Sequence, residues 1–343
     1  MTAVLTRRAL NRALLARQLL LVPADLPVVR AVEALAGMQA QWAPAPAIGL
    51  ASRLERFDPG ELAEALEQRR LVRGTLMRAT IHLVSARDYL RFRPALEPLL
   101  RRKWRQYYPR EPEPADLPEL IDRVTEATAE PRTAAELQAL AGHDEDEDER
   151  RLRWFRVRHE VPLVRTGERY VHAERWLGRP LEGGDQAVRH LVRRYLAAFG
   201  PAAPADVAAW SGLQVAEVRP ALADLRVRRF RDEAGRELID LPAAPRPAGE
   251  TPAPPRLLPR FDNLTLSHAD RSRVIADEHR RRIVRAAEVD AVFLVDGFVA
   301  GRWKLTRGRL TLEPFGRLAA TARRALEAEA ERLAEASRPT VAG

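Results

Sequence analysis

Cysteine is absent from the 343 residues of the chain. Its absence excludes disulfides, zinc sites built on thiolates, iron–sulfur clusters and a cysteine nucleophile. The seven histidines are scattered and form no HExxH or HxH pair. We therefore expect neither a metal site nor a cofactor.

Lysine is nearly absent, since Lys103 and Lys304 are the only two in the chain. An enzyme that works through a Schiff base would have only these two candidate amines. Almost every basic residue is arginine, which, beside the abundance of Ala, Leu and Pro, is also typical of GC-rich coding sequence. The formal net charge of +9 and the pI of about 10.6 favour a polyanionic partner, nucleic acid before an anionic membrane.

Long apolar runs are also missing. The longest, LARQLLLVPADLPVV, is interrupted by Gln18, Pro23 and Asp25, and a membrane span needs roughly 18–20 apolar residues. The N-terminus is basic and amphipathic and has no signal-peptide core. We expect a cytoplasmic protein with no membrane partner, divided by its length into two to four compact units.

The first expected unit covers residues 1–108. A helix pattern ends at Gly37, and Asp58-Pro59-Gly60-Glu61 reads as the capped start of another helix. The stretch LVRGTLMRATIHLV, residues 71–84, predicts a hairpin, and an amphipathic basic helix follows it. Three helices followed by a hairpin are typical of a winged helix.

The same order returns twice, in residues 109–182 and 183–243. In the second unit Thr133 and Glu136 predict a capping box, the acidic run at 144–149 predicts a solvated loop, and Gly167 marks a hairpin turn. In the third unit, Gly212 separates two helices, and Gly235 lies in the turn of the hairpin that forms the wing. Pro220 is expected to kink the last helix or delay its start.

Residues 244–256 form a Pro-rich linker, after which the pattern changes. Residues 257–343 predict a small β-rich domain, in which a meander turns at Asp296-Gly297 and Arg307-Gly308 and one long helix closes the sheet. The expected fold class is α+β, mainly α, with three tandem winged-helix units before this domain. Such units bind DNA, bind protein or are purely structural, so the fold does not settle the function.

Four blocks carry a family resemblance. They are GMQAQ, LMRATIHLVSARDY, LLPRFDNLTLSHADR and VFLVDGFVAGRWKL, in this order along the chain. With them the chain resembles the AlkZ/YcaQ family of bacterial winged-helix DNA glycosylases. The family signature is Gln, a hydrophobic residue, then Gln or Asp, and Gln39-Ala40-Gln41 matches it.

The resemblance implies hydrolysis of the N-glycosidic bond of alkylated purines, N7-alkylguanine above all, and in some relatives the unhooking of interstrand crosslinks. It implies three winged helices that form a concave basic surface around a duplex, with the glutamines in the cleft as catalytic residues. The partner would be double-stranded DNA with an alkylated base. We expect a monomer that acts at the bacterial nucleoid.

Glutamine has no useful pKa, but N7-alkylguanine already carries a positive charge and leaves without protonation. The resulting oxocarbenium-like state captures a poorly activated water, so two amides that fix a water's position would suffice. Gln39 and Gln41 can converge only in an extended segment, which Gly37, Pro44 and Pro46 favour. The alternative is that both amides cap a helix end or bond to backbone.

Further candidates for DNA contact come from the same blocks, each with a structural alternative. Trp42 would stack on the lesion or anchor its loop, and Arg78 would meet a phosphate at the hairpin tip. His82 would face the cleft or be packed. The loop residues Arg271 and Arg273 would contact phosphate or pair with Asp270. The strand residues Arg302 and Lys304 would face DNA or solvent. Asp262 and Asn263 read as turn residues as readily as site residues.

Two other functions stay open from the sequence. One is a DNA-binding protein without catalysis, such as a transcriptional regulator that reads DNA with the helix at 214–225. The other is a catalytically silent relative, or a module that binds an alkylating natural product. If the protein is a glycosylase, neutral catalytic groups predict action on cationic lesions but not on uracil, and the lysine shortage predicts a monofunctional enzyme.

Overall fold

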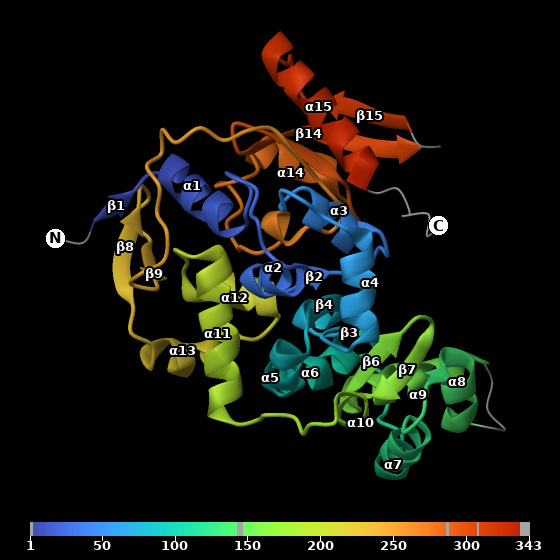
Figure 1. Cartoon of the computed structure of the whole chain (residues 1–343). Coiled ribbons are helices and arrows are strands. Elements are labelled where there is room, and N and C mark those ends of the chain that lie inside the picture. Colours follow the sequence, from blue (N-terminus) through green and yellow to red (C-terminus); the bar gives the residue numbers. More distant parts are fainter. Residues whose placement is uncertain (1–2, 143–146, 286–287, 307–308, 337–343) are drawn as a thin grey trace.

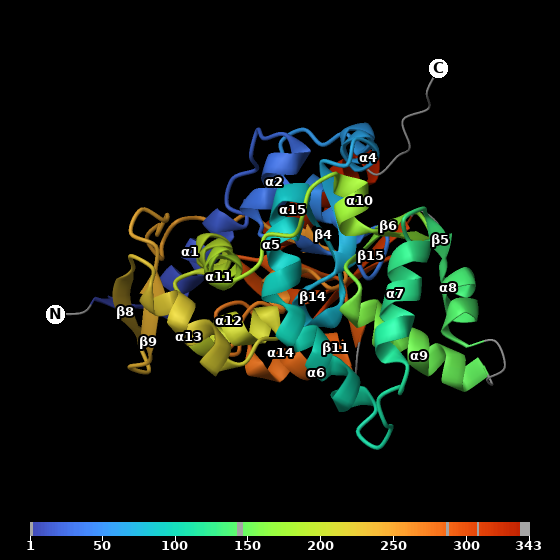
Figure 2. The ribbon, with the colours of Figure 1, turned by 90° about the horizontal axis from the view of Figure 1, so that it is seen from below.

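The computed structural model describes residues 3–142, 147–285, 288–306 and 309–336. Helices predominate, and short strands lie between them (Figure 1). Turning the molecule by 90° shows the same arrangement from below, with α7–α9 at one end and β8 and β9 at the other (Figure 2). None of the described helices is long and apolar enough to cross a membrane.

The first expected unit contains the predicted helices and hairpin. Asp58 caps the third predicted helix by accepting a hydrogen bond from the Gly60 N–H at 2.8 Å, as its sequence signature predicts. The segment after Gln41 was expected to be broken by prolines, but it holds a further helix, α3, because Pro44 and Pro46 fall at its start, where a missing N–H costs nothing. The elements are α1 (Arg7–Arg17), α2 (Val28–Ala34), β2 (Met38–Gln39), α3 (Ala45–Ala51), α4 (Pro59–Glu67), β3 (Leu71–Thr75) and β4 (Ile81–Ser85).

The basic helix that follows the hairpin is two helices. α5 spans Ala86–Ala95 and α6 spans Glu97–Tyr107, with the break at Leu96. Pro98, in the first turn of α6, has no N–H to continue the α5 ladder, so the chain starts a new helix there.

One six-stranded sheet joins the first two expected units. Its order is β2-β4-β3-β6-β7-β5, and β3 pairs antiparallel with β6. The expected boundary near residue 108 therefore divides the sequence but not the sheet. The elements of the second unit are α7 (Leu117–Ala127), β5 (Arg132–Thr133), α8 (Ala134–Ala141), α9 (Glu147–Glu160), β6 (Leu163–Thr166), β7 (Arg169–His172) and α10 (Ala173–Leu177).

In the second unit, the predicted capping box is present, but the predicted acidic loop is partly wrong. The capping box of Thr133 and Glu136 is present, with both reciprocal hydrogen bonds. The expected acidic loop is wrong for residues 147–149, which begin α9, since acidic side chains are favourable in the first turn of a helix. Residues 144–146 of that run lie outside the described residues.

The third unit follows the expected order of helices and hairpin. Gly212 ends α12 at φ 85°, and a Cβ there would lie 2.9 Å from the Leu99 side chain, so only glycine fits. The late start expected from Pro220 does not occur, because α13 already begins at Val215. The elements are α11 (Asp185–Phe199), α12 (Pro204–Ser211), α13 (Val215–Ala223), β8 (Arg228–Asp232) and β9 (Glu237–Asp240), with β1 (Val4–Leu5) paired parallel to β8.

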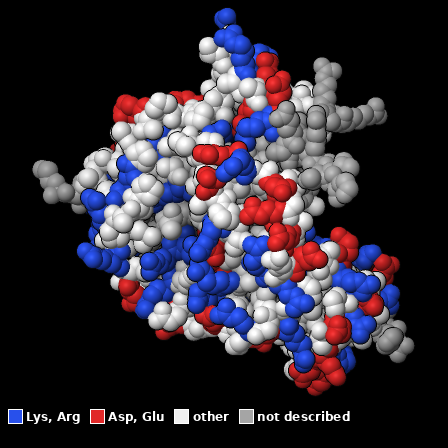
Figure 3. Space-filling view, in the orientation of Figure 1, with Lys and Arg blue, Asp and Glu red and all other residues white. Residues whose placement is uncertain are grey.

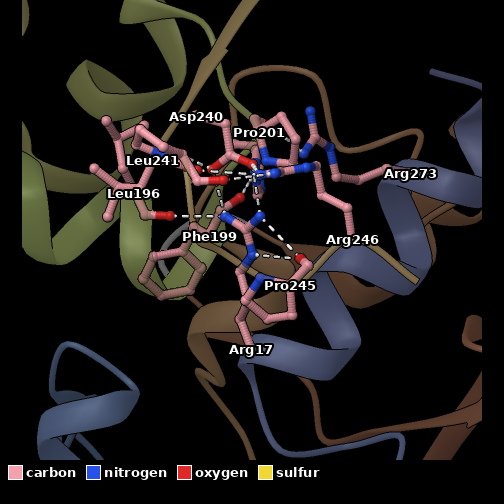
Figure 4. A network of polar contacts seen from close by, with 11 residues as sticks. Arg17, Leu196, Phe199, Pro201, Asp240, Leu241, Pro245, Arg246 and Arg273 are labelled. Atoms are coloured by element: carbon pink, nitrogen blue, oxygen red, sulfur yellow. Dashed lines mark hydrogen bonds and ion pairs between the residues drawn. The ribbon is translucent and has the colours of Figure 1, made fainter. Parts of the chain in front are cut away.

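A buried ion pair ties α1 to this third unit and to the Pro-rich linker (Figure 4). Arg17 donates to both carboxylate oxygens of Asp240 at 2.8 and 2.7 Å, and neither side chain is more than 1% exposed. Arg17 also donates to the Pro245 carbonyl, and Arg246 reaches the same carboxylate. The linker is therefore fixed at these points, and α1 shares the large apolar core with α5, α11 and α12.

The C-terminal region is a four-stranded sheet of order β10-β13-β14-β15, with α15 against β10 and α3. The turn at Asp296-Gly297 is confirmed by positive φ at both residues, whereas Arg307-Gly308 lies outside the described residues. A helix and a small hairpin precede the meander and were not predicted: α14, β11 and β12. The elements are β10 (Arg256–Leu258), α14 (Asp277–Ile283), β11 (Val284–Arg285), β12 (Glu288–Val289), β13 (Val292–Val295), β14 (Phe298–Thr306), β15 (Arg309–Pro314) and α15 (Ala320–Ala336).

Candidate active site around Gln39

The end of α2 places Gln39 in extended backbone. Ala36 and Gly37 both have positive φ, 55° and 88°, which stops the helix and turns the chain into β2. A Cβ on Gly37 would lie 2.6 Å from the Val84 side chain, so glycine is required here. The condition that the sequence set for Gln39, an extended segment directly after the helix, is therefore met.

Strand register decides which side chains share a face with Gln39. Gln39 lies opposite His82 in the antiparallel pair of β2 and β4, and His82 lies opposite Gly74 of β3. Residues directly opposite each other point to the same side of a sheet. Gln39 and His82 therefore face the same side, and both are buried, at 6% and 0% exposure.

Arg78 points inward from the tip of the hairpin. It sits at φ 55° in the 3-10 turn Met77–Ala79, and its Nη2 donates to Gln39 Oε1 at 2.7 Å and to Asn263 Oδ1 at 2.9 Å. Its Nη1 donates to the Trp210 carbonyl at 2.6 Å. The guanidinium thus joins the first unit, the third unit and the C-terminal region around the Gln39 amide.

The acceptors of Arg78 are all neutral. Burial, and secondarily the charge of Arg271, lower the pKa of Arg78 to about 10, so it stays a cation at neutral pH. Arg271 is half-buried, and Arg280 of α14 is close enough for its charge to lower the pKa of Arg271 as well. No described carboxylate lies within ion-pair distance of these three arginines. The neighbourhood of Gln39 is therefore positive and suited to an anion such as a phosphate.

His82 is an uncharged neighbour of Arg78. Its Nδ1 lies 3.0 Å from the Thr80 carbonyl, which assigns the proton to Nδ1 and leaves Nε2 as an acceptor 3.4 Å from Arg78 Nη2. Burial, followed by the charge of Arg78, lowers the pKa of His82 to about 3. His82 therefore offers neither a cation for phosphate nor a general acid at neutral pH.

Acid should destabilise the protein through this histidine. The pKa of an unfolded histidine is about 6.5, above the folded value, so the unfolded state takes up the proton first as the pH falls. The stabilising contribution is complete above pH 6.5 and shrinks toward pH 3, by about 1.4 kcal/mol per pH unit. Urea unfolding between pH 7.5 and 4.5 should show this slope, and His82→Gln should reduce it by that amount. An unchanged slope in the variant would show that His82 is charged in the folded protein.

Gln41 has a different partner from Gln39. It lies beyond the end of β2, is exposed, and its Oε1 accepts a hydrogen bond from the Ile81 N–H at 3.3 Å. This oxygen takes the place of a strand carbonyl beside the bond from the Ala40 N–H to the Ile81 carbonyl. The amide nitrogens of Gln39 and Gln41 donate to no residue that the structure describes.

A small pocket borders Gln39. Its volume is about 10 Å³, and Gly37, Gln39, Asp262 and Asn263 are among the residues that line it. That volume is close to the minimum that holds one water molecule. Asp262 pairs with Arg53 at 2.9 Å and caps the turn Asn263–Thr265, while Asn263 Nδ2 donates to the Gly37 carbonyl at 3.3 Å.

The remaining predicted residues lie in other settings. Trp42 is half-buried and packs against the C-terminal apolar cluster. Arg273 is 2% exposed and donates to the Pro201 carbonyl, and Asp270 pairs with Arg236 rather than with a neighbouring arginine. On β14, two predicted residues pair with acids, Arg302 with Asp290 and Glu313, and Lys304 with Glu313. Among the four basic residues predicted in the C-terminal region, only Arg271 lies near Arg78 and Gln39.

Exposed arginines gather in the third unit, and the space-filling view shows basic side chains over this side of the molecule (Figure 3). Five have no carboxylate within ion-pair distance among the described residues: Arg193, Arg219, Arg226, Arg228 and Arg231. They were not predicted as a group, although the stretch LRVRRFR, residues 225–231, contains three of them. Asn263 was left open as a turn or a site residue.

Comparisons with known proteins give the family of the chain and a likeness of fold. A family model described as DNA glycosylase AlkZ-like matches residues 32–336. A curated protein from Streptomyces sahachiroi named interstrand DNA cross-link repair glycosylase is 29% identical over 167 residues, 45% of this chain and 43% of that protein, so the match spans less than half of its length. The solved structure of Streptomyces sahachiroi DNA glycosylase AlkZ has a TM-score of 0.82 over 97% of both chains at 22% identity, which is a likeness of fold.

Proposed function

The chain belongs to the AlkZ-like DNA glycosylase family, and from this membership we propose that it is a monofunctional DNA glycosylase that hydrolyses the N-glycosidic bond of cationic alkylated purines such as N7-alkylguanine. The name of the Streptomyces sahachiroi relative extends the proposal to bases joined in interstrand crosslinks. The substrate is double-stranded DNA, bound by one copy of the protein at the bacterial nucleoid.

The observation that carries the proposal is the fixed amide of Gln39. Its Oε1 accepts a charge-assisted hydrogen bond from Arg78, which is the stronger kind and sets the orientation of the amide. The side chain borders a pocket of about one water's volume, and its Nε2 has no partner among the described residues. A fixed amide beside room for a water is what a water-positioning residue requires.

The reaction needs little more from the protein. The bond between C1′ and N9 breaks, and its electron pair leaves with the purine, which becomes neutral. A water that Gln39 and Gln41 position then adds to C1′ of the oxocarbenium-like sugar and releases its proton to solvent. No general acid is required, which agrees with a neutral His82.

Arginines would provide most of the binding to the DNA duplex. The five unpaired arginines of the third unit, Arg193, Arg219, Arg226, Arg228 and Arg231, would contact phosphates and release counterions. Arg280 and Arg271 would hold phosphates nearer to Gln39. Arg273, Arg302 and Lys304 are left out of this contact set because protein groups already bind them, and Trp42 is left out because it packs on the C-terminal cluster.

Incubation of the protein with a duplex that contains 7-methylguanine tests the proposal. We expect release of the free base and an abasic site without strand cleavage. Borohydride should trap no protein–DNA adduct, since Lys304 is paired with Glu313 and Lys103 donates to Gln106 on its own helix α6. Absence of base release under single-turnover conditions, or a trapped adduct, would contradict the proposal.

A DNA-binding protein without catalysis is the second candidate. It is favoured by the pair α12 and α13 around Gly212, with the exposed Arg219 on the second helix. Such a protein would bind one duplex sequence far more tightly than others and release no base. Equal binding to unrelated duplexes of the same length would count against it.

A further inference from the structure

A second basic pocket lies between the first two units, on the other face of the shared sheet. Its volume is about 290 Å³, and Arg73, Arg165, Thr166 and Trp176 are among the residues that line it. Arg73 precedes Gly74, which shares the face of Gln39, so Arg73 points to the opposite side. The pocket is thus separate from the candidate active site.

Two arginines face each other across the strands of this pocket. Arg73 of β3 lies directly opposite Arg165 of β6. Like charges in directly opposed positions destabilise a sheet unless something of the opposite charge lies between them. Burial, and secondarily the charge of Arg165, lower the pKa of Arg73, in keeping with this opposed position.

The hydrogen-bond donors of this pair are largely unused. The guanidinium of Arg73 donates to no residue that the structure describes, and Arg165 Nε is buried without a partner. Arg165 pairs with Glu168 at 3.2 Å and lies over the Tyr170 ring at 5.4 Å. The side chain of Glu168 is 93% exposed, so the ion pair contributes little. Arg165 Nε is thus a buried donor without a partner, which is costly, whereas Arg73 is only half-buried.

Aromatic and charged side chains also lie in and beside this pocket. Trp176 forms an aromatic wall, and Arg69 stacks on its ring at 4.0 Å and donates to its carbonyl at 2.9 Å. Glu67, also at the pocket, is exposed. The volume approaches the lower end of the usual range for small-ligand sites, roughly 300 Å³.

We propose that this pocket binds a phosphate group, whose oxygens accept hydrogen bonds from both Arg73 and Arg165. Guanidinium groups bind phosphate through paired, charge-assisted hydrogen bonds, and the anion would remove the repulsion between the two arginines. The phosphate belongs either to a free phosphate ester or to the DNA backbone. The proposal does not rest on glycosylase activity.

Calorimetric titration with inorganic phosphate and pyrophosphate tests the site. Arg73→Met should weaken binding of both by about tenfold or more, because it removes one of two paired donors. The matched control is Arg169→Met, which removes an exposed arginine from β7 of the same sheet. In phosphate-free buffer the Arg73→Met protein should melt at a higher temperature than wild type, which also verifies that it folds. Added phosphate should raise the melting temperature of wild type only.

Duplex titrations at several salt concentrations separate the two sources. If the ligand is a backbone phosphate, Arg73→Met lowers duplex affinity and reduces the slope of log K against log salt by about 1. If the ligand is a free phosphate ester, duplex affinity stays unchanged and only the phosphate titration differs. The proposal is overturned if Arg73→Met and Arg169→Met behave alike in the phosphate and the duplex titrations.

Discussion

Replacing Gln39 by Ala is expected to lower the single-turnover rate of 7-methylguanine release by about 100-fold, the size of effect that follows the misplacement of a reacting group. Ala removes the amide that Arg78 holds beside the water-sized pocket. Because that amide positions the water rather than the DNA, affinity for the duplex should change little. Rates are measured with enzyme in excess over a duplex that carries one lesion.

The control for Gln39→Ala is Gln68→Ala. Gln68 is an exposed glutamine at the end of α4 whose amide bonds only to Glu64, so its loss should leave the rate unchanged. Gln41→Ala should lower the rate by a smaller factor, about tenfold, since its oxygen is bonded to the Ile81 N–H. A Gln39→Ala protein that releases base at the wild-type rate would remove Gln39 from the mechanism.

Arg78→Met is expected to lower the same rate by about 30- to 100-fold, close to the effect of Gln39→Ala. The substitution leaves Gln39 Oε1, Asn263 Oδ1 and the Trp210 carbonyl without their shared donor. Arg78 acts through Gln39, so it is a positioning residue. Arg78→Lys keeps the charge but cannot reach three acceptors with one ammonium, so it should recover only part of the rate.

A double-mutant cycle separates positioning from general damage. If Arg78 works by orienting Gln39, the double variant Gln39→Ala/Arg78→Met should be no slower than the slower single variant. If Arg78 only supports the fold, the two losses should multiply, and duplex affinity should fall with them. Additive losses in free energy would therefore contradict the positioning role.

Local patterns predicted much of the fold. The stop at Gly37, the cap at Asp58 and the box at Thr133 are each set by a few neighbouring residues, so the sequence displays them directly. The hairpins at 71–84 and at Asp296-Gly297 follow from alternation and turn residues in the same way. The extended backbone of Gln39 belongs to this group, because it depends on the residue two positions before it.

Contacts between residues far apart in the sequence could not be predicted from local patterns. Arg78 read as a phosphate contact at an exposed tip, yet it binds the Trp210 carbonyl and Asn263, which lie 132 and 185 residues away. No periodicity or spacing encodes partners at such separations. The shared sheet of the first two units was missed for the same reason, since strand pairing between β3 and β6 depends on tertiary packing.

Shorter elements were missed for a different reason. Prolines at the start of α3 look like a break, although proline is favoured in the first turn of a helix. The basic stretch DEHRRRI forms α14 with only Ile283 buried, so it shows no apolar stripe. Sequence periodicity detects helices that bury one regular face. α14 buries too little to show one, and the prolines of α3 hide its start.

The most direct test of the account compares two lesions in one duplex sequence, 7-methylguanine and uracil, under single-turnover conditions. We expect rapid release of 7-methylguanine, whose base is already cationic, and no measurable release of uracil, a neutral base that needs leaving-group help which a neutral His82 and two amides do not supply. Release of uracil at a comparable rate would contradict this mechanism, because the protein would then have to assist the departure of a neutral base.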